Sequence, residues 1–440
     1  MIYDCIILFN EIDLLKLRCE ELDEVVDRFV VVEAPVTFSG RPKPLYFAKS
    51  SSRFDKFRSR IIHVIVQDMP TGRDAWARER HQRNCIRRGI TGASGDDGII
   101  ISDADEIPSA AAIRRWHPGL GACRFDQLFC YYWINCVGGT WAGSRILPFS
   151  GIGNFPDIHQ IRHTDFPLLN DGGWHFSYLG GHAAICAKLG AYSHQDLNIP
   201  KYRDDTYLSQ VTSLGLDLFG RSGSDFDFWD VDLRFPTTVQ REPARFRRFI
   251  CDARFTEKWS SPELLLCLSD LCRSVRRLSG AVIEIGCWEG RSTVVLAHAC
   301  HPETLLAIDT WRGNLDEHPN HSTVAIVATR DVFQQFLRNI VALTAGNVEP
   351  IREDCHAFLQ RWQQPVRFAY VDASHDYLSV KRTIEALLPR LVPGGILCGD
   401  DILTATCGRA DLYGGVERAV RELLPGFATA FNLWWWRQPS

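Results

Sequence analysis

The sequence IIISDADEIP, residues 99–108, changes from apolar to acidic within a few positions. Three consecutive isoleucines are typical of a strand that is buried on both faces of a sheet. Asp103, Asp105 and Glu106 lie at or just past the carboxyl end of this strand, the edge at which ligands bind in open α/β sheets. The Asp-x-Asp spacing offers hard oxygen ligands to a divalent cation and a phosphorylated ligand. A turn that leads into a helix after Pro108 is the competing interpretation.

The composition of the whole chain limits its class. Its 440 residues exceed one ordinary core, so we expect two domains. With 45% apolar and 23% charged residues the chain is globular, and its net charge of −4 argues against a protein that binds nucleic acid. The 15 cysteines are an odd number without a Cys-x-x-Cys pair, which argues against a disulfide framework or a zinc site. We therefore expect a reduced, cytoplasmic location.

The hydropathy pattern does not predict membrane insertion. Residues 3–9 form a strand-like run without a basic segment or a cleavage site, so no signal peptide is expected. No run of 18 apolar residues is present, so no transmembrane segment is expected either. Five arginines gather between residues 241 and 254. A solvated linker and a peripheral contact with acidic lipids or an anionic acceptor are both compatible with this cluster.

We place the domain boundary at this arginine-rich segment. Residues 1–245 are predicted to form one domain, residues 246–262 a linker, and residues 263–440 a second domain. Strands alternate with helices in the first domain, which predicts an α/β fold with a largely parallel sheet. The expected strands are 5–9, 29–33, 61–66 and one beginning at 99, and the expected helices are 11–22 and 74–88. Aromatic residues and glycine pairs after residue 108 predict a substrate cleft.

The second domain begins with a helix and continues as βα units. Glu284, Gly286 and Gly290 lie where its first strand runs into a glycine turn and then a helix, so the backbone can approach a ligand closely. Asp309 ends the next strand, where an acid can accept both hydroxyls of a ribose. Strands are predicted at residues 281–285, 305–308, 348–351, 368–371, 395–398 and 431–436.

This half resembles the class I S-adenosylmethionine (SAM)-dependent methyltransferases, which have a Rossmann-like α/β fold. The resemblance implies that SAM is the cofactor and that Glu284, Gly286 and Gly290 form the cofactor turn. It further implies that Asp309 holds the ribose and that Asp354, after the third strand, lies beside the adenine.

Two later segments, YVDASHDY (370–377) and PGGILCGDD (393–401), carry acids after strands. Asp372, Asp400 and Asp401 are placed to converge on one cation, which resembles the metal-dependent O-methyltransferases, including those acting on catechols and on sugar hydroxyls. In the catechol type the third ligand is an Asn, whereas this chain has Asp401. A cation would lower the pKa of an acceptor hydroxyl, and His375 is the candidate to accept its proton. Alternatively, Asp372 and Asp400 form turns and His375 lies at the surface.

The first half resembles the glycosyltransferase family of the bisecting β-1,4-N-acetylglucosaminyltransferases, which are inverting enzymes. The matching segments are FNEIDLL (9–15), VVVEA (30–34), FSGRPKP (38–44), SDADEIP (102–108) and GWHFS (173–177). The resemblance implies a GT-A-like nucleotide-sugar fold in which Asp103 and Asp105 bind a divalent metal, Mn²⁺ or Mg²⁺, that holds the diphosphate of the donor. Losing ~4 kcal/mol of such stabilisation would slow transfer roughly a thousandfold.

The same resemblance assigns further donor contacts. It places Glu33 near the nucleoside and Arg83 with Asn84 near the phosphates. Because Arg80, Arg83 and Arg87 recur at helical spacing, a solvated helix face is the competing interpretation.

The third metal ligand and the general base are less defined by the sequence. We expect His175, in a glycine-flanked aromatic segment, rather than His194 to complete the metal site. An inverting reaction also needs a general base for the acceptor hydroxyl, and the candidates are Asp196 and Asp157.

Together these resemblances predict a bifunctional enzyme. One domain would transfer a sugar from a nucleotide-sugar donor, which is UDP-N-acetylglucosamine (UDP-GlcNAc) on the family resemblance alone. The other would methylate a sugar hydroxyl with SAM, and the acceptor would be a glycan or glycoconjugate held near both sites by the fusion. The alternatives are a second domain that only binds or dimerises and a lectin-like first domain. The sequence does not determine the oligomeric state.

Overall fold

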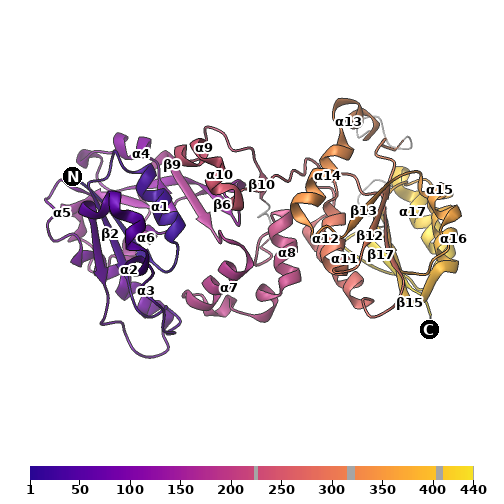
Figure 1. Ribbon diagram of the computed structural model, residues 1–440, viewed down its shortest axis with the longest axis horizontal. Coiled ribbons are helices and arrows are strands. Elements are labelled where there is room, and N and C mark those ends of the chain that lie inside the picture. The colour runs from indigo at the N-terminus through magenta and orange to yellow at the C-terminus, as the bar shows by residue number, and fades with distance from the viewer. Residues whose placement is uncertain (222–225, 315–322, 403–409, 440) are drawn as a thin grey trace. The chain divides into compact units, whose positions relative to one another are not determined.

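The computed structural model describes residues 1–221, 226–314, 323–402 and 410–439, apart from the side chains of 410–413. The chain divides into two compact units, unit 1 (Met1–Cys251) and unit 2 (Asp252–Ser440) (Figure 1). This division lies within the predicted linker range, residues 246–262. None of the helices in the described parts of the chain combines the length and the hydropathy needed to cross a bilayer.

Unit 1 is built around a mixed sheet with the strand order β10-β7-β6-β8-β4-β1-β2-β3, and β9 pairs with β5 and β6 beside this path. The strands are β1 (Ile2–Leu8), β2 (Arg28–Glu33), β3 (Ile61–Ile65), β4 (Gly98–Asp103), β5 (Glu106–Pro108), β6 (Cys123–Tyr131), β7 (Cys136–Trp141), β8 (Arg145–Pro148), β9 (Leu168–Ser177) and β10 (Asp227–Phe228). The helices are α1 (Ile12–Glu21), α2 (Tyr46–Ser50), α3 (Ala75–Asn84), α4 (Ala110–Arg115), α5 (Phe149–Ile152), α6 (His159–His163), α7 (Gly181–Ala191), α8 (Asp205–Leu214), α9 (Thr237–Arg241) and α10 (Pro243–Phe246).

The sheet of unit 1 is parallel only in part. Strands β3, β2, β1 and β4 are parallel neighbours, as the alternation of strands and helices predicts. Strand β8 is antiparallel to β4 and β6, and β7 is antiparallel to β6. The prediction of a largely parallel sheet is therefore wrong for this half of the sheet. The connections β6–β7 and β7–β8 are only a few residues long, too short for the crossover that a parallel pair requires.

The isoleucine run is buried on both faces of β4, which confirms the prediction from its composition. Ile99, Ile100 and Ile101 are each 0% exposed. Since side chains alternate across a strand, Ile100 packs into the cluster that contains Leu15 of α1, whereas Ile99 and Ile101 belong to the cluster that contains Ile86. This double burial holds the acidic end of β4 at a defined place on the sheet edge.

Unit 2 contains a sheet with the strand order β13-β12-β11-β14-β15-β17-β16, parallel except that β17 is antiparallel to both neighbours. This is the class I methyltransferase fold. The strands are β11 (Ala281–Ile285), β12 (Leu305–Asp309), β13 (Val348–Arg352), β14 (Val366–Val371), β15 (Leu391–Gly399), β16 (Ala428–Ala430) and β17 (Leu433–Arg437). The helices are α11 (Pro262–Ser274), α12 (Arg291–Cys300), α13 (Thr323–Thr329), α14 (Val332–Leu343), α15 (Cys355–Arg361), α16 (Tyr377–Leu387) and α17 (Ala410–Leu423).

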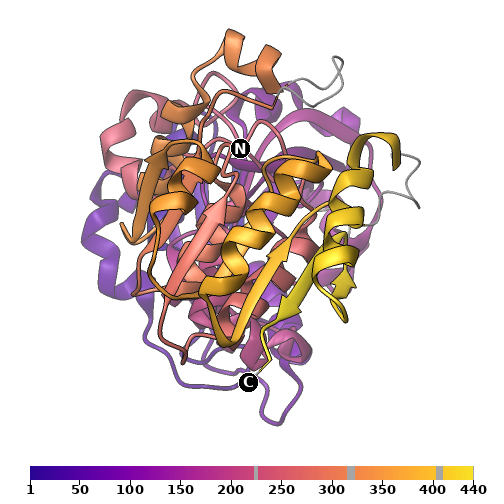
Figure 2. The same ribbon diagram turned by 90° about the vertical axis from the view of Figure 1, so that its right-hand side faces the viewer.

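Helices α15, α16 and α17 cover one face of this sheet (Figure 2). Ile384 of α16 and Val420 of α17 pack there with Ile283 and Leu397 of the central strands. The tryptophan run at the carboxyl terminus forms β17, as predicted, and Trp434 is 1% exposed. The carboxyl ends of β11, β12, β14 and β15 therefore lie along one edge, where the predicted site residues of this unit follow.

Candidate functional site

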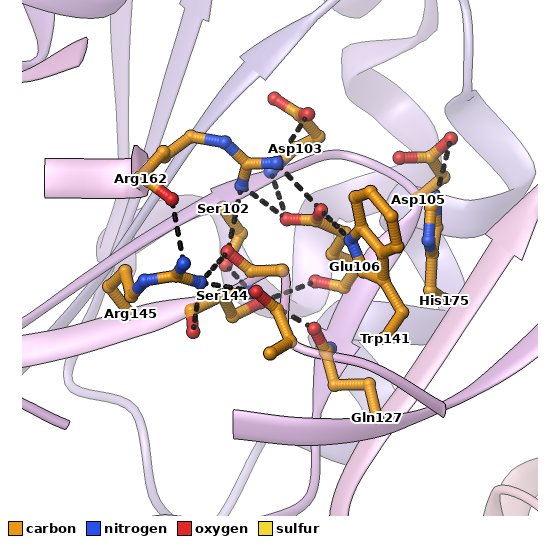
Figure 3. Close-up of polar contacts among 12 residues, drawn as sticks. Ser102, Asp103, Asp105, Glu106, Gln127, Trp141, Ser144, Arg145, Arg162 and His175 are labelled. Atoms are coloured by element: carbon orange, nitrogen blue, oxygen red, sulfur yellow. Dashed lines mark hydrogen bonds and ion pairs between the residues drawn. The ribbon is translucent and has the colours of Figure 1, made fainter. Parts of the chain in front are cut away.

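The acidic segment of unit 1 joins β4 to β5 (Figure 3). Asp103, the last residue of β4, is the more open of its two aspartates, with a side chain 34% exposed. Its Oδ1 lies 2.8 Å from Nη1 of Arg83, and its Oδ2 lies 3.0 Å from Nη2 of Arg162. Burial alone would raise the pKa of Asp103, but the two guanidinium groups hold it below its usual value.

Asp105 is buried and has its own cation. Nζ of Lys188, from α7, lies 2.5 Å from Oδ2 of Asp105, and Nε2 of His175, from β9, lies 3.7 Å from the same oxygen. Although burial opposes ionisation, Lys188 and His175 hold the pKa of Asp105 well below its usual range. The Lys188 ammonium, on a side chain that is 26% exposed, therefore favours the ionised form of Asp105.

Glu106 organises the acidic segment from within. It is 1% exposed, its Oε1 accepts hydrogen bonds from Nη2 of Arg162 at 2.7 Å and Nε1 of Trp141 at 2.9 Å, and its Oε2 accepts the backbone N–H of Asp103 at 3.0 Å. The helix that follows is capped instead by Ser109, whose Oγ accepts the N–H of Ala112 at 3.1 Å. Glu106 thus fixes the position of Arg162 between the two carboxylates.

Arg18 holds the backbone of the same segment, a role that was not predicted from the sequence. It forms a fully buried ion pair with Asp4 at 2.5 Å, the two side chains being 0% and 1% exposed. Its guanidinium also donates to the carbonyls of Asp103, at 3.2 Å, and of Glu106. A charged residue between Leu17 and Cys19, and an aspartate inside the apolar β1, were the available signals.

The predicted metal set of unit 1 is only partly assembled. Among the described residues, Asp103, Asp105 and His175 do not place three ligand atoms close to one another. Each carboxylate faces protein cations, so a divalent cation that arrives with a diphosphate would have to displace Arg83 or Arg162 from Asp103. These residues do not fit a preformed three-ligand metal site, and His194 lies elsewhere, packed against Trp76 and 52% exposed.

The remaining predicted residues of unit 1 lie in different surroundings. Glu33 is fully buried at the end of β2, with His63 at 3.2 Å and Lys43 at 3.5 Å. Arg83 is 1% exposed, so the interpretation of a solvated helix face does not hold for it. Asn84 hydrogen-bonds to Asp157 at 2.9 Å and anchors the segment before α6.

The two predicted general bases contact residues other than the acids of the segment. Asp157 accepts from Asn84 and from the backbone N–H of His159 at 2.9 Å, which is a helix-capping role. The side chain of Asp196 is 73% exposed and lies 3.9 Å from Nδ1 of His194.

In unit 2, the glycine turn after β11 is shaped for close backbone contact. Gly286 has φ +87°, and a Cβ at this position would lie 2.0 Å from the carbonyl oxygen of Asp372, so no other residue fits without a shift. Gly290 has φ +88° and precedes α12. Glu284 is fully buried, accepts a hydrogen bond from Oγ of Ser292 at 2.6 Å, and has a pKa raised to about 7 by burial.

Asp309 holds this turn against the end of β12. Its Oδ2 accepts the backbone N–H groups of Cys287 at 2.8 Å and Trp288 at 3.0 Å, and its Oδ1 accepts that of Trp311 at 2.7 Å. Two carboxylate oxygens offer about four acceptor positions, so with three backbone N–H groups bound about one position remains for a ribose hydroxyl. Asp354 is exposed and caps α15 by accepting the N–H of Ala357 at 3.0 Å.

Of the three acids predicted to converge after β14 and β15, Asp372 and Asp401 lie close together, and His375 rather than Asp400 lies with them. Asp372, His375 and Asp401 place their ligand atoms within 4.8 Å of one another. Nε2 of His375 lies 3.1 Å from Oδ2 of Asp401. Asp400 turns aside, and its Oδ1 accepts the backbone N–H of Asp401 at 2.7 Å and Nδ2 of Asn432 at 2.9 Å. His375, predicted as a base, thus also lies where it could act as a metal ligand.

The electrostatics of this cluster favour a cation. Burial, and then the charge of Asp401, raise the pKa of Asp372 to about 6. Burial together with Asp372 and Asp401 raises the pKa of Asp400 well above its usual value. Carboxylates and an imidazole are ligands for divalent cations, and a cation would relieve this repulsion. The residues present therefore fit a metal ion.

Comparisons with known proteins agree with this division of the chain. Residues 1–242 match Glycosyltransferase family 17, and residues 283–402 match a methyltransferase domain. The "Beta-1,4-mannosyl-glycoprotein 4-beta-N-acetylglucosaminyltransferase" of Homo sapiens is 35% identical over 108 residues, which are 23% of this chain and 20% of that protein. The Mus musculus protein of the same description is 34% identical over 108 residues, with the same coverage. The chain thus spans about a fifth of the length of these curated relatives.

Several solved structures similar to part of the chain are described as methyltransferases. The O-methyltransferase NovP has a TM-score of 0.33 and 16% identity, and the match covers 40% of this chain and 79% of that one. A putative methyltransferase from Streptococcus mutans in complex with SAH has a TM-score of 0.29 and 16% identity, covering 39% of this chain and 96% of that one.

Unit 2 carries the methyltransferase domain. The match of unit 1 spans more than half of the 440 residues, and the chain belongs to glycosyltransferase family 17.

Proposed function

We propose that the chain is a bifunctional glycan-modifying enzyme, in which unit 1 transfers N-acetylglucosamine from UDP-GlcNAc and unit 2 methylates a sugar hydroxyl with SAM. The observation that carries this proposal is the presence of a family 17 glycosyltransferase domain and a methyltransferase domain in one chain. The name of the curated relatives supports the choice of donor sugar.

In unit 1 the residues of the acidic segment act on the diphosphate of the donor. Breaking the bond between the sugar and the diphosphate concentrates negative charge on the leaving group. Arg83, Arg162 and Lys188 lie at the end of β4, fixed by Asp103, Asp105 and Glu106 before any ligand binds. Fixed cations of this kind stabilise developing charge without reorganisation. We propose an inverting transfer, in which the acceptor attacks from the face opposite the diphosphate.

In unit 2 the glycine turn and Asp309 are the residues that would hold SAM. Gly286 and Gly290 allow close approach of the backbone, and Asp309 has acceptor capacity for the ribose. Asp372, His375 and Asp401 would hold a divalent cation such as Mg²⁺ or Mn²⁺. The cation, when bound, lowers the pKa of the acceptor hydroxyl so that its oxygen can attack the methyl group.

Nucleotide release from a panel of nucleotide sugars tests unit 1. The assay contains Mn²⁺ and Mg²⁺, because aspartates are ligands for both, and it is repeated with EDTA. We expect UDP-GlcNAc to give the fastest release of nucleotide when a glycan acceptor is present. Binding of sugars without any release from the panel would favour the lectin-like alternative and would contradict the proposal.

Calorimetry with SAM tests unit 2 against the alternative of a binding or dimerisation module. We expect heat of binding for the full chain and its loss in an Asp309→Ala variant, with Asp331→Ala on the same unit as a control. Absence of binding heat for the unaltered chain would support the module.

Titration with Mn²⁺ tests the cation site without an activity measurement. At 100 times its dissociation constant, an ion stabilises a protein by about 2.7 kcal/mol, so the melting temperature of unit 2 is expected to rise. An Asp401→Asn variant should lose this rise because one of the three clustered ligands is neutralised. An equal rise in the variant would place the ion elsewhere.

The order of the two reactions is the last part of the proposal. A tether raises the effective concentration of one product at the second site, so we propose that both units act on one glycan. Methylation assays with glycosylated and unglycosylated acceptor test this coupling. Equal rates on both acceptors would contradict it while leaving each activity intact.

A further inference from the structure

Unit 1 contains a cavity of about 470 Å³. It is lined by the connection between β1 and α1, the β6–β7 turn, the beginning of α7 and residues 248–249. Pockets for small ligands commonly measure roughly 300–1,000 Å³, so a sugar residue is a suitable occupant by size.

Glu11 and Lys188 connect the cavity with the acidic segment at the end of β4. Ile7 of β1 is opposite Asp103 of β4, so the chain leaving β1 emerges beside the acidic segment. Glu11 lines the cavity, and Lys188, which pairs with Asp105, is electrostatically coupled to Glu11. A ligand in the cavity would therefore lie next to the residues that face the donor.

The lining has the chemistry of a sugar-binding site. Trp133 supplies a partly exposed aromatic ring, held in place by a hydrogen bond from its Nε1 to the carbonyl of Thr212 at 3.0 Å. Tyr132 also lines the cavity, but it is 3% exposed and its hydroxyl donates to the carbonyl of Leu216 at 2.9 Å. Aromatic rings of this kind combine an apolar face with a polar edge, which suits the apolar face of a pyranose. Tyr132 adopts φ +63°, an uncommon conformation for a bulky residue and one that is typically retained at functional positions.

Two carboxylates line the cavity: Asp13 is paired with Arg53 at 2.6 Å and with Arg248, whereas Glu11 is held by the backbone. Its Oε2 accepts the backbone N–H groups of Phe9 and Asn10, both at 3.0 Å. Within the described parts of the chain, no group donates a hydrogen bond to Oε1 of Glu11. Burial raises the pKa of Glu11; Lys188 opposes this rise, and Asp105 adds to it, while Lys43 also faces the group. Glu11 therefore has one oxygen fixed and one able to accept a proton.

We infer that this cavity is the acceptor subsite of the sugar transfer and that Glu11 is the general base, an inference that rests on the proposed glycosyltransferase activity. The acceptor hydroxyl gives its proton to Oε1 of Glu11, and its oxygen forms a bond to the anomeric carbon of the donor. The bond from that carbon to the diphosphate oxygen breaks, and its electron pair leaves with the diphosphate. Glu11 returns the proton to water after the product departs.

The sequence candidates for this role lie outside the cavity. Neither Asp196 nor Asp157 is among its lining residues. Glu11 belongs instead to the FNEIDLL segment (9–15), one of the segments that carry the family resemblance.

A Glu11→Gln variant of the full chain tests the base. Glutamine keeps an acceptor oxygen for the two backbone N–H groups but cannot take a proton at neutral pH. With UDP-GlcNAc and a panel of p-nitrophenyl glycosides, kcat is expected to fall about 100-fold or more, the contribution typical of a general base. The KM for the glycoside and the calorimetric affinity for UDP are expected to stay unchanged. Glu24→Gln, an exposed carboxylate with a side chain 82% exposed, is the matched control.

Saturation-transfer NMR with the same glycosides tests the subsite without turnover. We expect transfer from the protein to a glycoside in the unaltered chain and in Glu11→Gln, and its loss in Trp133→Ala but not in Trp259→Ala of unit 2.

The possible outcomes separate the inference from the proposed function. Unchanged kcat in Glu11→Gln, or loss of kcat in Asp196→Asn alone, would overturn the role of Glu11. Absence of glycoside binding to the unaltered chain, or binding that survives Trp133→Ala, would overturn the subsite. Glycoside binding without release of nucleotide from any donor would contradict the glycosyltransferase activity but not the subsite.

Discussion

In both units aspartates follow the carboxyl ends of strands, β4 in unit 1 and β14 in unit 2, yet their pKa values are shifted in opposite directions. In unit 1 the carboxylates of Asp105 and Glu106 have pKa values well below their usual range, because Lys188 and Arg162 lie against them. In unit 2 the pKa of Asp372 is raised to about 6, because burial and the charge of Asp401 outweigh the opposing effects of His375 and of the hydrogen bond from the Tyr370 hydroxyl.

This difference separates two ways of preparing an acidic site. In unit 1 the acids are paired with cations of the protein itself. Unit 2 leaves its acids with little compensation, which favours an added cation or protons. A strand end rich in aspartate therefore has no single meaning until the groups that pack against it are known.

The largest expected effect comes from exchanging one aspartate in each unit for asparagine. Asp103→Asn removes the charge that holds Arg83 and Arg162, so sugar transfer should fall about a thousandfold, or ~4 kcal/mol, while methylation is unchanged. Asp372→Asn should do the reverse. Nucleotide release from UDP-GlcNAc and methyl transfer from labelled SAM are measured on the same preparation. Loss of both activities in a folded variant would contradict the independence of the two sites.

The next effect concerns the support beneath the unit 1 segment. Arg18→Met leaves Asp4 buried without its partner, which should lower the free energy of unfolding of unit 1 by about 3–4 kcal/mol. The double variant Arg18→Met, Asp4→Leu removes both charges and should recover part of that loss. Urea unfolding followed by fluorescence measures both. A double variant less stable than the single one would show that the pair itself stabilises the fold.

A pH-dependent effect should distinguish unit 2. The carboxyl of Glu284 has a pKa of about 7 when folded and of 4.5 as its ordinary value, so the folded state holds the proton to higher pH. The free energy of unfolding should therefore fall as pH rises from about 4.5 to about 7, by up to about 3 kcal/mol, and remain lower above that. Glu284→Gln should remove this loss. Thermal unfolding of unit 2 at pH 5 and pH 8 tests this prediction. An equal change in melting temperature between the two pH values in the unaltered chain and in Glu284→Gln would contradict it.

The smallest effect is expected from a matched pair on α3. Arg80 is exposed, so Arg80→Ala should change stability by less than about 0.5 kcal/mol and leave sugar transfer intact. Arg83→Ala removes a buried cation from Asp103 and should slow transfer at least about tenfold, or ~1.4 kcal/mol. Nucleotide release compares the two variants. Equal activities of the two variants would contradict a role of Arg83 in sugar transfer.

Much of the fold was predictable because its signals are local. The isoleucine run of β4, the glycine turn at residues 286–290 and the tryptophan strand each depend on a short stretch whose burial or backbone conformation follows from its own residues. The antiparallel half of the unit 1 sheet was not predicted, because pairing direction depends on connection length and partners rather than on strand composition.

The candidate sites divide in the same manner. The strand ends and the acids that follow them, together with a resemblance to two families, could be recognised in the sequence, because they depend on short stretches of residues. The three-dimensional structure was needed to show that Arg162 and Lys188 lie against the acids of unit 1, that His375 lies near Asp372 and Asp401, and that Glu11 lines a cavity. Charge compensation acts through space between residues far apart in the chain, and for that reason no local pattern carries it.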